Sequence, residues 1–435
     1  MLAVNSGSSS IKLGLYRGTE AGGCRPARVL GIDIDRIGTS ATTMRIVDAS
    51  GSEENEALPD RDFEASFACA LVAIERRGLL AAIAGIGHRV VHGGKTRMSH
   101  QRITPVVIDR LRDAIPLARS HMPQALAGIA CVAQSLPSVP QVACFDTAFH
   151  QTMPRVAKMH ALPRSVRIDK RIEPLPIFER FGFHGLSYEY ICRALSEIDP
   201  VAARGRVIVL HLGNGASIAA IADGNSVDTT MGFTPNSGLV MGTRSGDVDP
   251  GVVAWLLREA KLPLDALENL LERQSGLLGI SGTTSDMREL LELEREKDHA
   301  GTDDTAGAFD AARADDTADG TTDDKPGSAA DAIALFCYRA TKTIGAYASV
   351  LGGVDTIVFS GGIGERSATI RERICAGQAH LGIHIDPSTN ATHAPVISTD
   401  RSIVTVRVIH TDEESMIVRH TLAVLAVTSP AVKSN

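Results

Sequence analysis

Several features that would place this 435-residue chain in a particular class are missing from its sequence. No apolar run approaches the roughly 18 residues that a membrane-spanning helix needs. The chain begins with neither the basic nor the apolar stretch of a signal peptide. Its net charge is −7, with 44 Lys and Arg against 51 Asp and Glu, so no excess of basic residues predicts nucleic-acid binding. We therefore expect a cytoplasmic protein that binds neither a nucleic acid nor a membrane.

Metal-binding and disulfide patterns are missing as well. The seven cysteines are scattered along the chain without a CxxC pair, which favours reduced and mostly buried thiols over a disulfide framework. The histidines show no HExxH or other zinc spacing. The chain is instead 44% hydrophobic and 22% charged, as in ordinary globular proteins. At this length it can hold two or three domains, each with its own core.

The N-terminus contains a short apolar run, Leu2–Val4, then a polar turn, Asn5–Ser10, and then an alternating run, Ile11–Tyr16. This pattern predicts a β-hairpin. Small hydroxyls, free backbone N–H groups and the nearby Lys12 are suited to holding phosphate oxygens. An ordinary polar hairpin tip uses the same residues. The segment is not a Walker P-loop, because it has no Gly-Lys-Ser/Thr and no helix follows.

The pattern of a strand followed by a small polar turn occurs again later in the chain. A strand at Arg206–Leu212 enters the turn Gly213–Ser217, and a second strand is predicted at Ile218–Ala222. A further strand, Thr356–Ser360, ends in the glycine-rich segment Gly361–Glu365, after which a helix is predicted. Strands that end in glycine-rich turns in two parts of one chain indicate two similar halves facing one nucleotide. This organisation resembles the actin, sugar-kinase and Hsp70-type ATPase fold.

Periodicity predicts the other elements and a division into two domains. Strands are expected over 29–46, 85–94, 142–145 and 404–409. Helices are expected over 63–80, 107–118, 123–135, 186–197, 252–260, 263–274, 285–294, 329–351 and 415–425. We expect an α/β protein whose first domain is 1–146 completed by 414–435 and whose second is 147–413. The segment of about 297–328 is rich in Asp, Ala, Thr and Gly and is read as a solvated insertion, either an inert surface loop or a regulatory one.

Polar residues at strand ends are the first candidates for chemistry. Arg89 lies in an otherwise apolar, glycine-rich strand, and Asp146 follows a short buried strand, where α/β proteins place their ligands. A buried arginine needs an anionic partner, which an anionic substrate or a structural salt bridge would supply. Arg244 is flanked by glycine and small hydroxyls, with Asp247 and Asp249 just after it. The string is either a turn with a surface ion pair or an arginine fixed by one of these carboxylates and aimed at a phosphoryl group.

Histidines and hard oxygen donors supply further candidates. His184 and His211 each lie beside glycines, where either could donate a hydrogen bond to a phosphoryl group or serve only a structural role. Asn5 and Glu413 each follow an apolar strand, and their oxygens suit Mg²⁺. A charge at a helix N-terminus would also explain Glu413.

Together these strings resemble the motifs of acetate and propionate kinases. They are NSGSSSIK (5–12), HRVVHGG (88–94), FDTAFHQTMP (145–154), FGFHG (181–185), HLGNG (211–215), MGTRSGDVDP (241–250), SGGIGE (360–365) and TDEE (411–414). They run in order along nearly the whole chain except the acidic insertion. The resemblance implies reversible transfer of phosphate from ATP to acetate, an actin-like fold of two mixed sheets with the nucleotide cleft between them, and a homodimer. It also implies Mg²⁺, with Mn²⁺ as an alternative.

The resemblance also implies roles for individual residues. Metal binding falls to Asn5 and Glu413, and binding of the nucleotide phosphates to Lys12. Arg89 would bind the acetate carboxylate, and His184 and Arg244 would stabilise the transition state. Asp146 is the family's catalytic acidic residue, which we expect to orient Arg89 or a metal-bound water. The acyl pocket would use Val91, Phe183 and Pro235. The nucleotide would lie along His211, Leu212, Gly213, Asn214, Gly215, Asp286, Met287, Arg288, Gly362, Ile363, Gly364, Glu365 and Arg366.

One departure from the family pattern concerns the acyl group. Ser120 stands where the family usually has a pocket leucine, so the choice between acetate and propionate stays open. One apolar contact is worth only about 1–3 kcal/mol. Two other classes compete with the kinase: an actin-like ATPase without an acid acceptor, and a non-catalytic relative that acts through the insertion. A pure ATPase needs no carboxylate-binding Arg89, and the retained Asn5, Lys12 and Glu413 argue against loss of catalysis.

Overall fold

The computed structural model describes residues 1–7, 9–17, 26–94, 99–163, 178–300 and 328–428. The chain separates into two compact units. Unit 1 comprises Met1–Tyr190 and Asp412–Asn435, and unit 2 comprises Ile191–Thr411. The chain thus crosses between the units twice, first within the helix α5 (Gly185–Ile198) and then at Thr411–Asp412. The first crossover lies after the 146/147 boundary that the sequence suggested.

Unit 1 is built on a mixed sheet of eight strands in the order β5-β4-β3-β2-β1-β6-β8-β7. The central strands β1, β6 and β8 are parallel, and the others pair antiparallel. The strand bounds are β1 Leu2–Ser6, β2 Ser10–Arg17, β3 Ala27–Asp35, β4 Thr43–Asp48, β5 Glu53–Ala57, β6 Ile86–Val90, β7 Gln101–Arg102 and β8 Gln141–Phe145.

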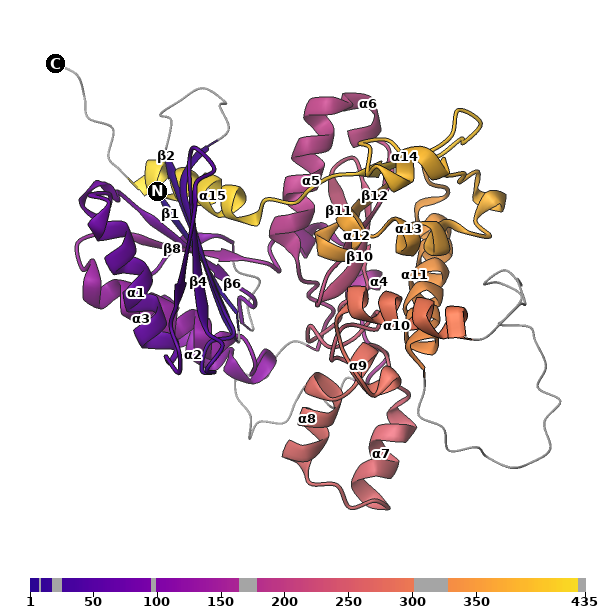
Figure 1. The fold of residues 1–435 in the computed structure, drawn as a ribbon, viewed down its shortest axis with the longest axis horizontal. Helices are drawn as coiled ribbons and strands as arrows, with labels where there is room; N and C mark the ends of the chain where they lie inside the picture. The colour runs from indigo at the N-terminus through magenta and orange to yellow at the C-terminus, as the bar shows by residue number, and fades with distance from the viewer. Residues whose placement is uncertain (8, 18–25, 95–98, 164–177, 301–327, 429–435) are drawn as a thin grey trace. The chain divides into compact units, whose positions relative to one another are not determined.

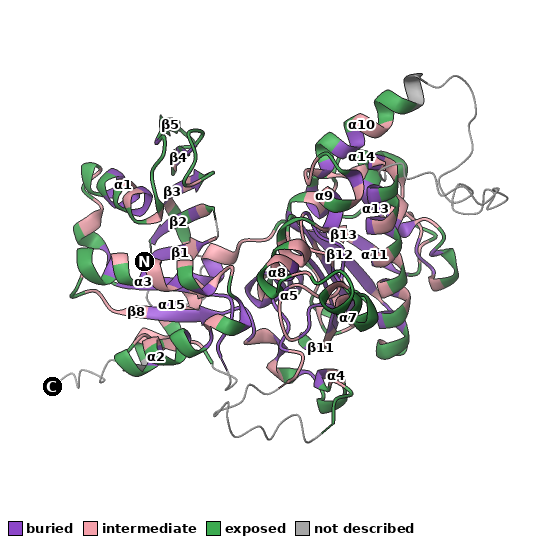
Figure 2. Ribbon diagram, turned by 90° about the horizontal axis from the view of Figure 1, so that it is seen from below, coloured by how far each residue is buried: buried purple, intermediate pink, exposed green. Residues whose placement is uncertain are grey.

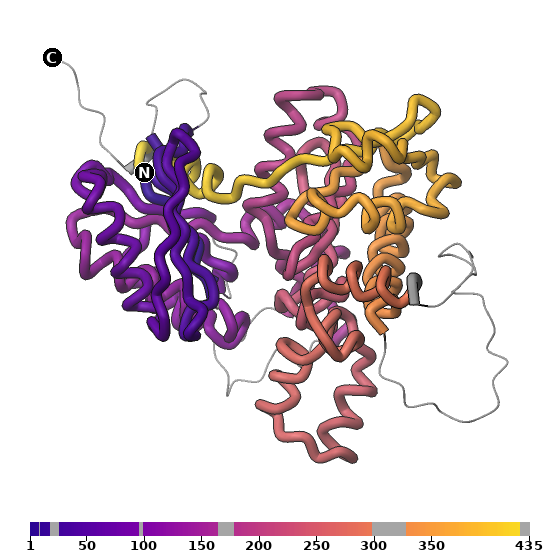
Figure 3. Tube along the Cα trace, in the orientation of Figure 1, coloured from indigo at the N-terminus to yellow at the C-terminus, as the bar shows by residue number. Residues whose placement is uncertain are grey.

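Helices cover both faces of this sheet. On one face α3 packs on β1 and β6, with α1 beside it, and on the other α15 packs on β1, β6 and β8. Figure 3 shows this last helix, in yellow, beside the indigo N-terminal strands. The central strands are buried, whereas β5 is exposed along its length (Figure 2). The helices of unit 1 are α1 Phe63–Arg76, α2 Pro105–Asp113, α3 Met122–Ser135, α4 Arg155–Lys158, the first turns of α5, and α15 Glu413–Thr428.

Unit 2 repeats the same plan with a smaller sheet. Its strands lie in the order β11-β10-β9-β12-β13, with β9, β12 and β13 parallel and the β9–β10–β11 meander antiparallel. The bounds are β9 Arg206–Leu212, β10 Ala216–Ala222, β11 Asn225–Thr229, β12 Thr356–Ser360 and β13 Thr405–Val408. The helices are α6 Pro200–Ala203, α7 Pro250–Arg258, α8 Leu264–Arg273, α9 Gly276–Ser281, α10 Met287–Ala300, α11 Ala329–Leu351, α12 Gly361–Arg366, α13 Ala368–Cys375 and α14 Pro387–Ala391.

The two sheets share one strand order around their centres. In unit 1 the run is β3-β2-β1-β6-β8, and in unit 2 it is β11-β10-β9-β12-β13. Each run contains an antiparallel three-strand meander followed by two parallel strands. The turn after β1 therefore corresponds to the turn after β9. The predicted α/β class, with two mixed sheets flanked by helices, is confirmed.

Local sequence explains where several elements begin and end. The predicted helix over 107–118 is too long, because Pro116 has no N–H to donate and the α-helix α2 stops at Asp113. The helix α11 begins as predicted, at a capping box of Ser328 and Asp331. In the predicted insertion, residues 301–327 lie outside the described residues. No helix in the described part of the chain is long and apolar enough to span a membrane.

Candidate active site

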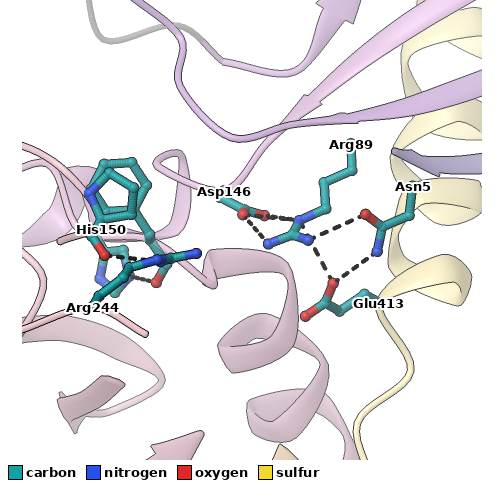
Figure 4. Close-up of polar contacts among 8 residues, drawn as sticks. Asn5, Arg89, Asp146, His150, Arg244 and Glu413 are labelled. Atoms are coloured by element: carbon teal, nitrogen blue, oxygen red, sulfur yellow. Dashed lines mark hydrogen bonds and ion pairs between the residues drawn. The ribbon is translucent and has the colours of Figure 1, made fainter. Parts of the chain in front are cut away.

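Three strand ends and one helix start bring four polar side chains together in unit 1 (Figure 4). Asn5 lies near the end of β1, Arg89 in β6, and Asp146 directly after β8. The strands β1, β6 and β8 are parallel, so their ends lie at the same edge of the sheet. Glu413 joins them from the first turn of α15, which packs against all three strands. Residues more than 400 positions apart in the sequence thus form one cluster.

The guanidinium of Arg89 is held on two sides. Its Nε lies 3.1 and 3.0 Å from the two carboxylate oxygens of Asp146, and its Nη2 donates to Oδ2 at 2.6 Å. Its Nη1 donates to Asn5 Oδ1 at 3.2 Å, and Glu413 Oε2 lies 3.7 Å from Nε. This fork is the strongest geometry available to an Arg–carboxylate pair. Asp146 is thus the structural salt-bridge partner that the sequence left open for Arg89.

Burial sets the charges in this cluster. Burial lowers the pKa of Arg89, but the charges of Asp146 and Glu413 outweigh it, so the net shift is upward and Arg89 stays charged. Asp146 is completely buried. That burial raises the pKa of its carboxyl to about 6, although Arg89 and the His184 backbone N–H act to lower it. Glu413 adds a neighbouring negative charge that raises it further.

Asn5 and Glu413 place an amide and a carboxylate next to each other. Asn5 Nδ2 lies 3.4 Å from Glu413 Oε2, a long hydrogen bond that leaves the two groups side by side. Lys12 is the register partner of Asn5 on β2, so its exposed side chain is on the same face of the sheet. The Lys12 charge also acts on Glu414, the next residue after Glu413.

The Phe183-His184-Gly185 string packs directly against Asp146. The backbone N–H of Gly185 donates to the Asp146 carbonyl at 3.0 Å, and that of His184 bonds to the Asp146 carboxylate. A Cβ on Gly185 would lie 2.0 Å from the Asp146 carbonyl oxygen, so only glycine fits. His184 has a φ of +58°, an uncommon conformation for this residue. The string is therefore shaped to bring its backbone against the acidic residue.

Two histidines near this cluster, His92 and His150, are buried, and so are the two pocket residues of unit 1. Burial lowers the pKa of His150 and of His92 to about 4, so both rings are neutral at pH 7. His150 Nε2 lies 3.0 Å from the Phe183 carbonyl, and this geometry supports a donor role for that nitrogen. The His92 ring packs on Phe183, with centroids 5.7 Å apart. Phe183 and Val91, which the resemblance assigns to the acyl pocket, are 1% and 8% exposed.

In unit 2, Arg244 lies in a turn whose backbone is fixed on both sides. Met241 N–H donates to the Arg244 carbonyl, and Gly242 N–H donates to the Asn214 carbonyl in the β9–β10 turn. Arg244 Nη1 donates to the carbonyl of Pro235, the third residue assigned to the acyl pocket, at 3.0 Å.

The expected pairing of Arg244 with Asp247 or Asp249 is wrong. In the described residues, Asp247 accepts the Gly238 N–H at 2.8 Å. Asp249 caps α7 by accepting the Gly251 N–H at 2.6 Å. Both carboxylates thus serve the backbone, as short acidic side chains beside glycines and helix starts commonly do.

The β9–β10 turn and α12 form a second glycine-rich cluster in unit 2. His211 on β9 is the register partner of Ser360 at the end of β12, so the 211–215 and 362–366 segments start from neighbouring strands. Gly361 has a φ of +75°, and a Cβ there would lie 2.7 Å from the Leu212 carbonyl oxygen. The structure thus brings together two of the three segments assigned to the nucleotide.

The third segment, Asp286–Arg288, starts α10. Asp286 Oδ1 accepts the Arg288 backbone N–H at 2.8 Å, and the two side chains pair at 2.6 Å. Met287 is 3% exposed, whereas the Arg288 side chain is 85% exposed. Asp286 thus caps the start of α10, and the Arg288 guanidinium lies at the surface.

Sequence reasoning missed several polar side chains around these sites. Arg371 on α13 is completely buried, and burial lowers its pKa to about 10. It donates to the carbonyls of Gly364 and Glu365 at 2.9 and 3.0 Å and to Asn390 Oδ1 at 2.8 Å. Nothing in the string RERIC separates this buried arginine from the ordinary helix-surface arginine two residues on, so no sequence signal could have found it.

A second missed group is His100, Glu189 and His420, whose ligand atoms lie within 4.8 Å of one another. The three residues come from segments far apart in the sequence, so no local spacing predicts the group. His100 Nδ1 accepts the Phe145 backbone N–H at 3.0 Å. A neutral His100 ring therefore carries its proton on Nε2 and offers no lone pair there to a metal ion. We interpret the group as a hydrogen-bonded cluster.

Comparison with known proteins identifies the family. A family model described as the acetokinase family matches residues 1–313 and 311–419. The chain belongs to the acetokinase family. It is 41% identical over 432 residues to the acetate kinase of Methylocella silvestris, and the match covers 98% of both chains.

Two solved structures are similar to this acetokinase-family chain over nearly its whole length. A propionate kinase from Francisella tularensis matches with a TM-score of 0.81 at 33% identity, covering 97% of this chain and 98% of that one. The acetate kinase of Porphyromonas gingivalis matches with a TM-score of 0.78, also at 33% identity, covering 98% and 99%. The family resemblance predicted from the sequence is therefore confirmed.

Proposed function

We propose that this member of the acetokinase family transfers the γ-phosphoryl group of ATP to acetate, giving acetyl phosphate and ADP, and that it also catalyses the reverse reaction. The observation that carries the proposal is the Arg89 guanidinium, fixed by Asp146 beside Asn5 and Glu413. A pure ATPase has no need of an arginine positioned in this way for an acid.

Arg89 is the proposed anchor for the acetate carboxylate. Asp146 already occupies its Nε and Nη2, so acetate would approach the Nη1 side, where Asn5 now accepts. Asp146 is not needed as a base, because a carboxylic acid with a pKa of about 4–5 is ionised at neutral pH. Its proposed role is to orient Arg89 so that an acetate oxygen points at the phosphorus atom. This is catalysis by positioning.

The proposed step is a direct in-line displacement. An acetate oxygen forms the new bond to the γ-phosphorus as the bond to the ADP oxygen breaks, and ADP leaves with that electron pair. His184 and Arg244 would stabilise the charge on the transferring group. Lys12 and the 211–215, 286–288 and 362–366 segments would bind the nucleotide. These roles follow the resemblance, and the fixed backbones around His184 and Arg244 support them.

Mg²⁺ is the proposed metal, held by Asn5 and Glu413, with Mn²⁺ as an alternative. The Asn5 amide lies beside the Glu413 carboxylate, with its nitrogen 3.4 Å from Oε2 and its oxygen accepting from Arg89 Nη1. With that oxygen turned to the ion, the pair is a donor set that suits a hard cation, and Mg²⁺ commonly uses one or two carboxylates plus phosphates. When bound, it would neutralise charge on the phosphates of ATP.

A second candidate function is propionate kinase. The similarity to the Francisella tularensis propionate kinase and the presence of Ser120 in place of a pocket leucine favour it. We also propose a cytoplasmic homodimer on the family resemblance, which light scattering of the purified protein tests directly.

The testing experiment measures acyl-hydroxamate formation with Mg-ATP and acetate, propionate or butyrate, alongside ATP hydrolysis without any acid. Product that depends on the smallest acids supports the kinase, and the order of kcat/KM assigns the preferred acid. Hydrolysis that ignores the added acid would instead identify an ATPase.

A further inference from the structure

The Glu365 carboxylate, on the short helix α12, is buried and has hydrogen-bond partners at both of its oxygens. The residue is 8% exposed. Its Oε1 accepts the backbone N–H groups of Gly361 and Thr411 at 3.0 and 3.1 Å, and the Ser360 hydroxyl lies 3.4 Å away. Its Oε2 lies 2.7 Å from His410 Nδ1. Three of the four partners lie at Oε1, which fills its roughly two lone-pair sites, and His410 alone lies at Oε2, which keeps one further site.

This bonding argues against a nucleotide contact by Glu365 itself. A ribose hydroxyl would find Oε1 filled and only one lone pair of Oε2, on a side chain that is 10% exposed, and phosphate oxygens would be repelled by the carboxylate. Removing the bond to a buried backbone N–H also leaves that group unsatisfied, which costs stability. The place of Glu365 in the 362–366 segment therefore reflects what it holds in that segment.

Glu365 holds two backbone segments that meet here. One is the tight start of α12 at Gly361, whose φ of +75° sets it against the end of β9. The other is His410–Thr411, which follows β13 and enters the second crossover between the units. Thr411 is two residues before Glu413, the proposed metal ligand. Arg371 donates hydrogen bonds to the other end of the same short helix, at the Gly364 and Glu365 carbonyls.

We propose that Glu365 is a positioning residue that ties the nucleotide-binding segment to the crossover leading into Glu413. The inference rests on the proposed function, because that function assigns the nucleotide to the 362–366 segment and the metal ion to Glu413. The carboxylate acts through backbone N–H groups that it fixes. If α12 becomes less ordered, the loss of order therefore passes from Thr411 through Asp412 to Glu413.

The test compares Glu365→Gln, Glu365→Ala and His410→Ala. Glutamine keeps an oxygen that can accept from Gly361 and Thr411, so we expect kcat/KM for ATP within about threefold of the parent protein. Alanine removes both bonds, and a fall of about 10- to 100-fold is expected for the loss of one or two charge-assisted hydrogen bonds. His410→Ala is the matched control. It removes only the Oε2 partner, whose side chain is 75% exposed, and should stay within about threefold.

Two further readouts separate positioning from direct contact. Amide hydrogen exchange at Gly361 and Thr411 should be faster in Glu365→Ala and unchanged in Glu365→Gln, whatever reaction the protein catalyses. In a double-mutant cycle on kcat/KM, Glu365→Ala and Glu413→Gln should be strongly non-additive, because the first variant acts through the segment that carries the second residue.

Three results would overturn the proposal. The first is a folded Glu365→Gln protein that loses more than tenfold in kcat/KM for ATP, because that would show a direct need for the charge. The second is Glu365→Ala with parental kinetics and unchanged exchange at Thr411. The third is strict additivity in the cycle. Failure of the parent protein to form any acyl hydroxamate, with the exchange pattern as expected, would refute the proposed function and leave the structural link intact.

Discussion

Replacing Asp146 with asparagine tests how Arg89 is used. The carboxylate makes three contacts with the guanidinium, at 2.6, 3.0 and 3.1 Å. Asparagine has nearly the same shape, but it is neutral and offers one oxygen instead of two. Its amide nitrogen would face a guanidinium N–H, so one or two of the three contacts are lost while the side-chain volume is kept.

The magnitude follows from those contacts. A hydrogen bond to a charged group contributes about 1.5–3 kcal/mol, so losing one or two removes about 1.5–6 kcal/mol of the stabilisation that fixes the guanidinium. The middle of that range, about 2–4 kcal/mol, is the expected loss. If that geometry matters only in the transition state, kcat falls about 30- to 1,000-fold. The KM for acetate should change by less than about threefold, because the Arg89 charge and its Asn5 contact remain.

The assay is steady-state acyl-hydroxamate formation at varied acetate and saturating Mg-ATP. Asp355→Asn is the matched control, because Asp355 makes the same forked pair with Arg206 in unit 2, at 2.5 and 3.0 Å, where both side chains are about 40% exposed. It should leave kcat unchanged. A large rise in the acetate KM with kcat retained would refute the reasoning, since Asp146 would then hold Arg89 for binding alone.

Three other outcomes are expected. The kcat of the parent protein should fall as the pH drops through about 6. Burial raises the pKa of Asp146 to about 6, and protonation removes the acceptor that orients the guanidinium. A pH–rate profile of Asp146→Asn that kept this acidic limb would contradict the assignment. Gly185→Ala should abolish most activity, because its Cβ would lie 2.0 Å from the Asp146 carbonyl oxygen. Gly345→Ala, with open space around its Cβ, should be active and slightly more stable in urea titrations. Equal activity of the two variants would show that the close contact is dispensable. Arg371→Met should lower the free energy of unfolding by about 2–4 kcal/mol in the same titrations, because buried carbonyls lose their donors, and an unchanged urea midpoint would show that water replaces the guanidinium.

Much of the fold could be predicted because periodicity and turn residues are local signals. The hairpins with predicted turns at Asn5–Ser10 and Gly213–Ser217 follow from apolar runs on either side of a polar turn. Both hairpins are present, although the second strand of the latter starts at Ala216, two residues earlier than predicted. Helix ends were less accurate wherever one residue decides them. The structure ends α2 before Pro116 and starts α7 at the Asp249 cap, two residues earlier than the pattern indicated.

The candidate site was only partly predictable, for a different physical reason. Strand-end positions correctly placed Arg89 and Asp146 at the same edge, because parallel strands carry their ends to one side of a sheet. The partner of a charged group depends on tertiary contacts that no spacing records. Asp247 or Asp249 was expected to fix Arg244 because both are near in sequence, yet these carboxylates accept the N–H groups of Gly238 and Gly251. Glu365 was assigned to the nucleotide by motif, and its hydrogen bonds became visible only in three dimensions.

The return of α15 to the first sheet has a consequence for the order in which the protein is made. Residues 191–411 form one continuous stretch, so unit 2 has all its strands as soon as Thr411 leaves the ribosome. The β1, β6 and β8 strands emerge earlier, but one face of their sheet stays uncovered until residues 413–428 arrive. Although domains commonly fold as they emerge, N-terminal first, the N-terminal unit here is completed last. Glu413 reaches Asn5 and Arg89 in that same event, so a nascent chain that stops before Glu413 lacks part of the cluster.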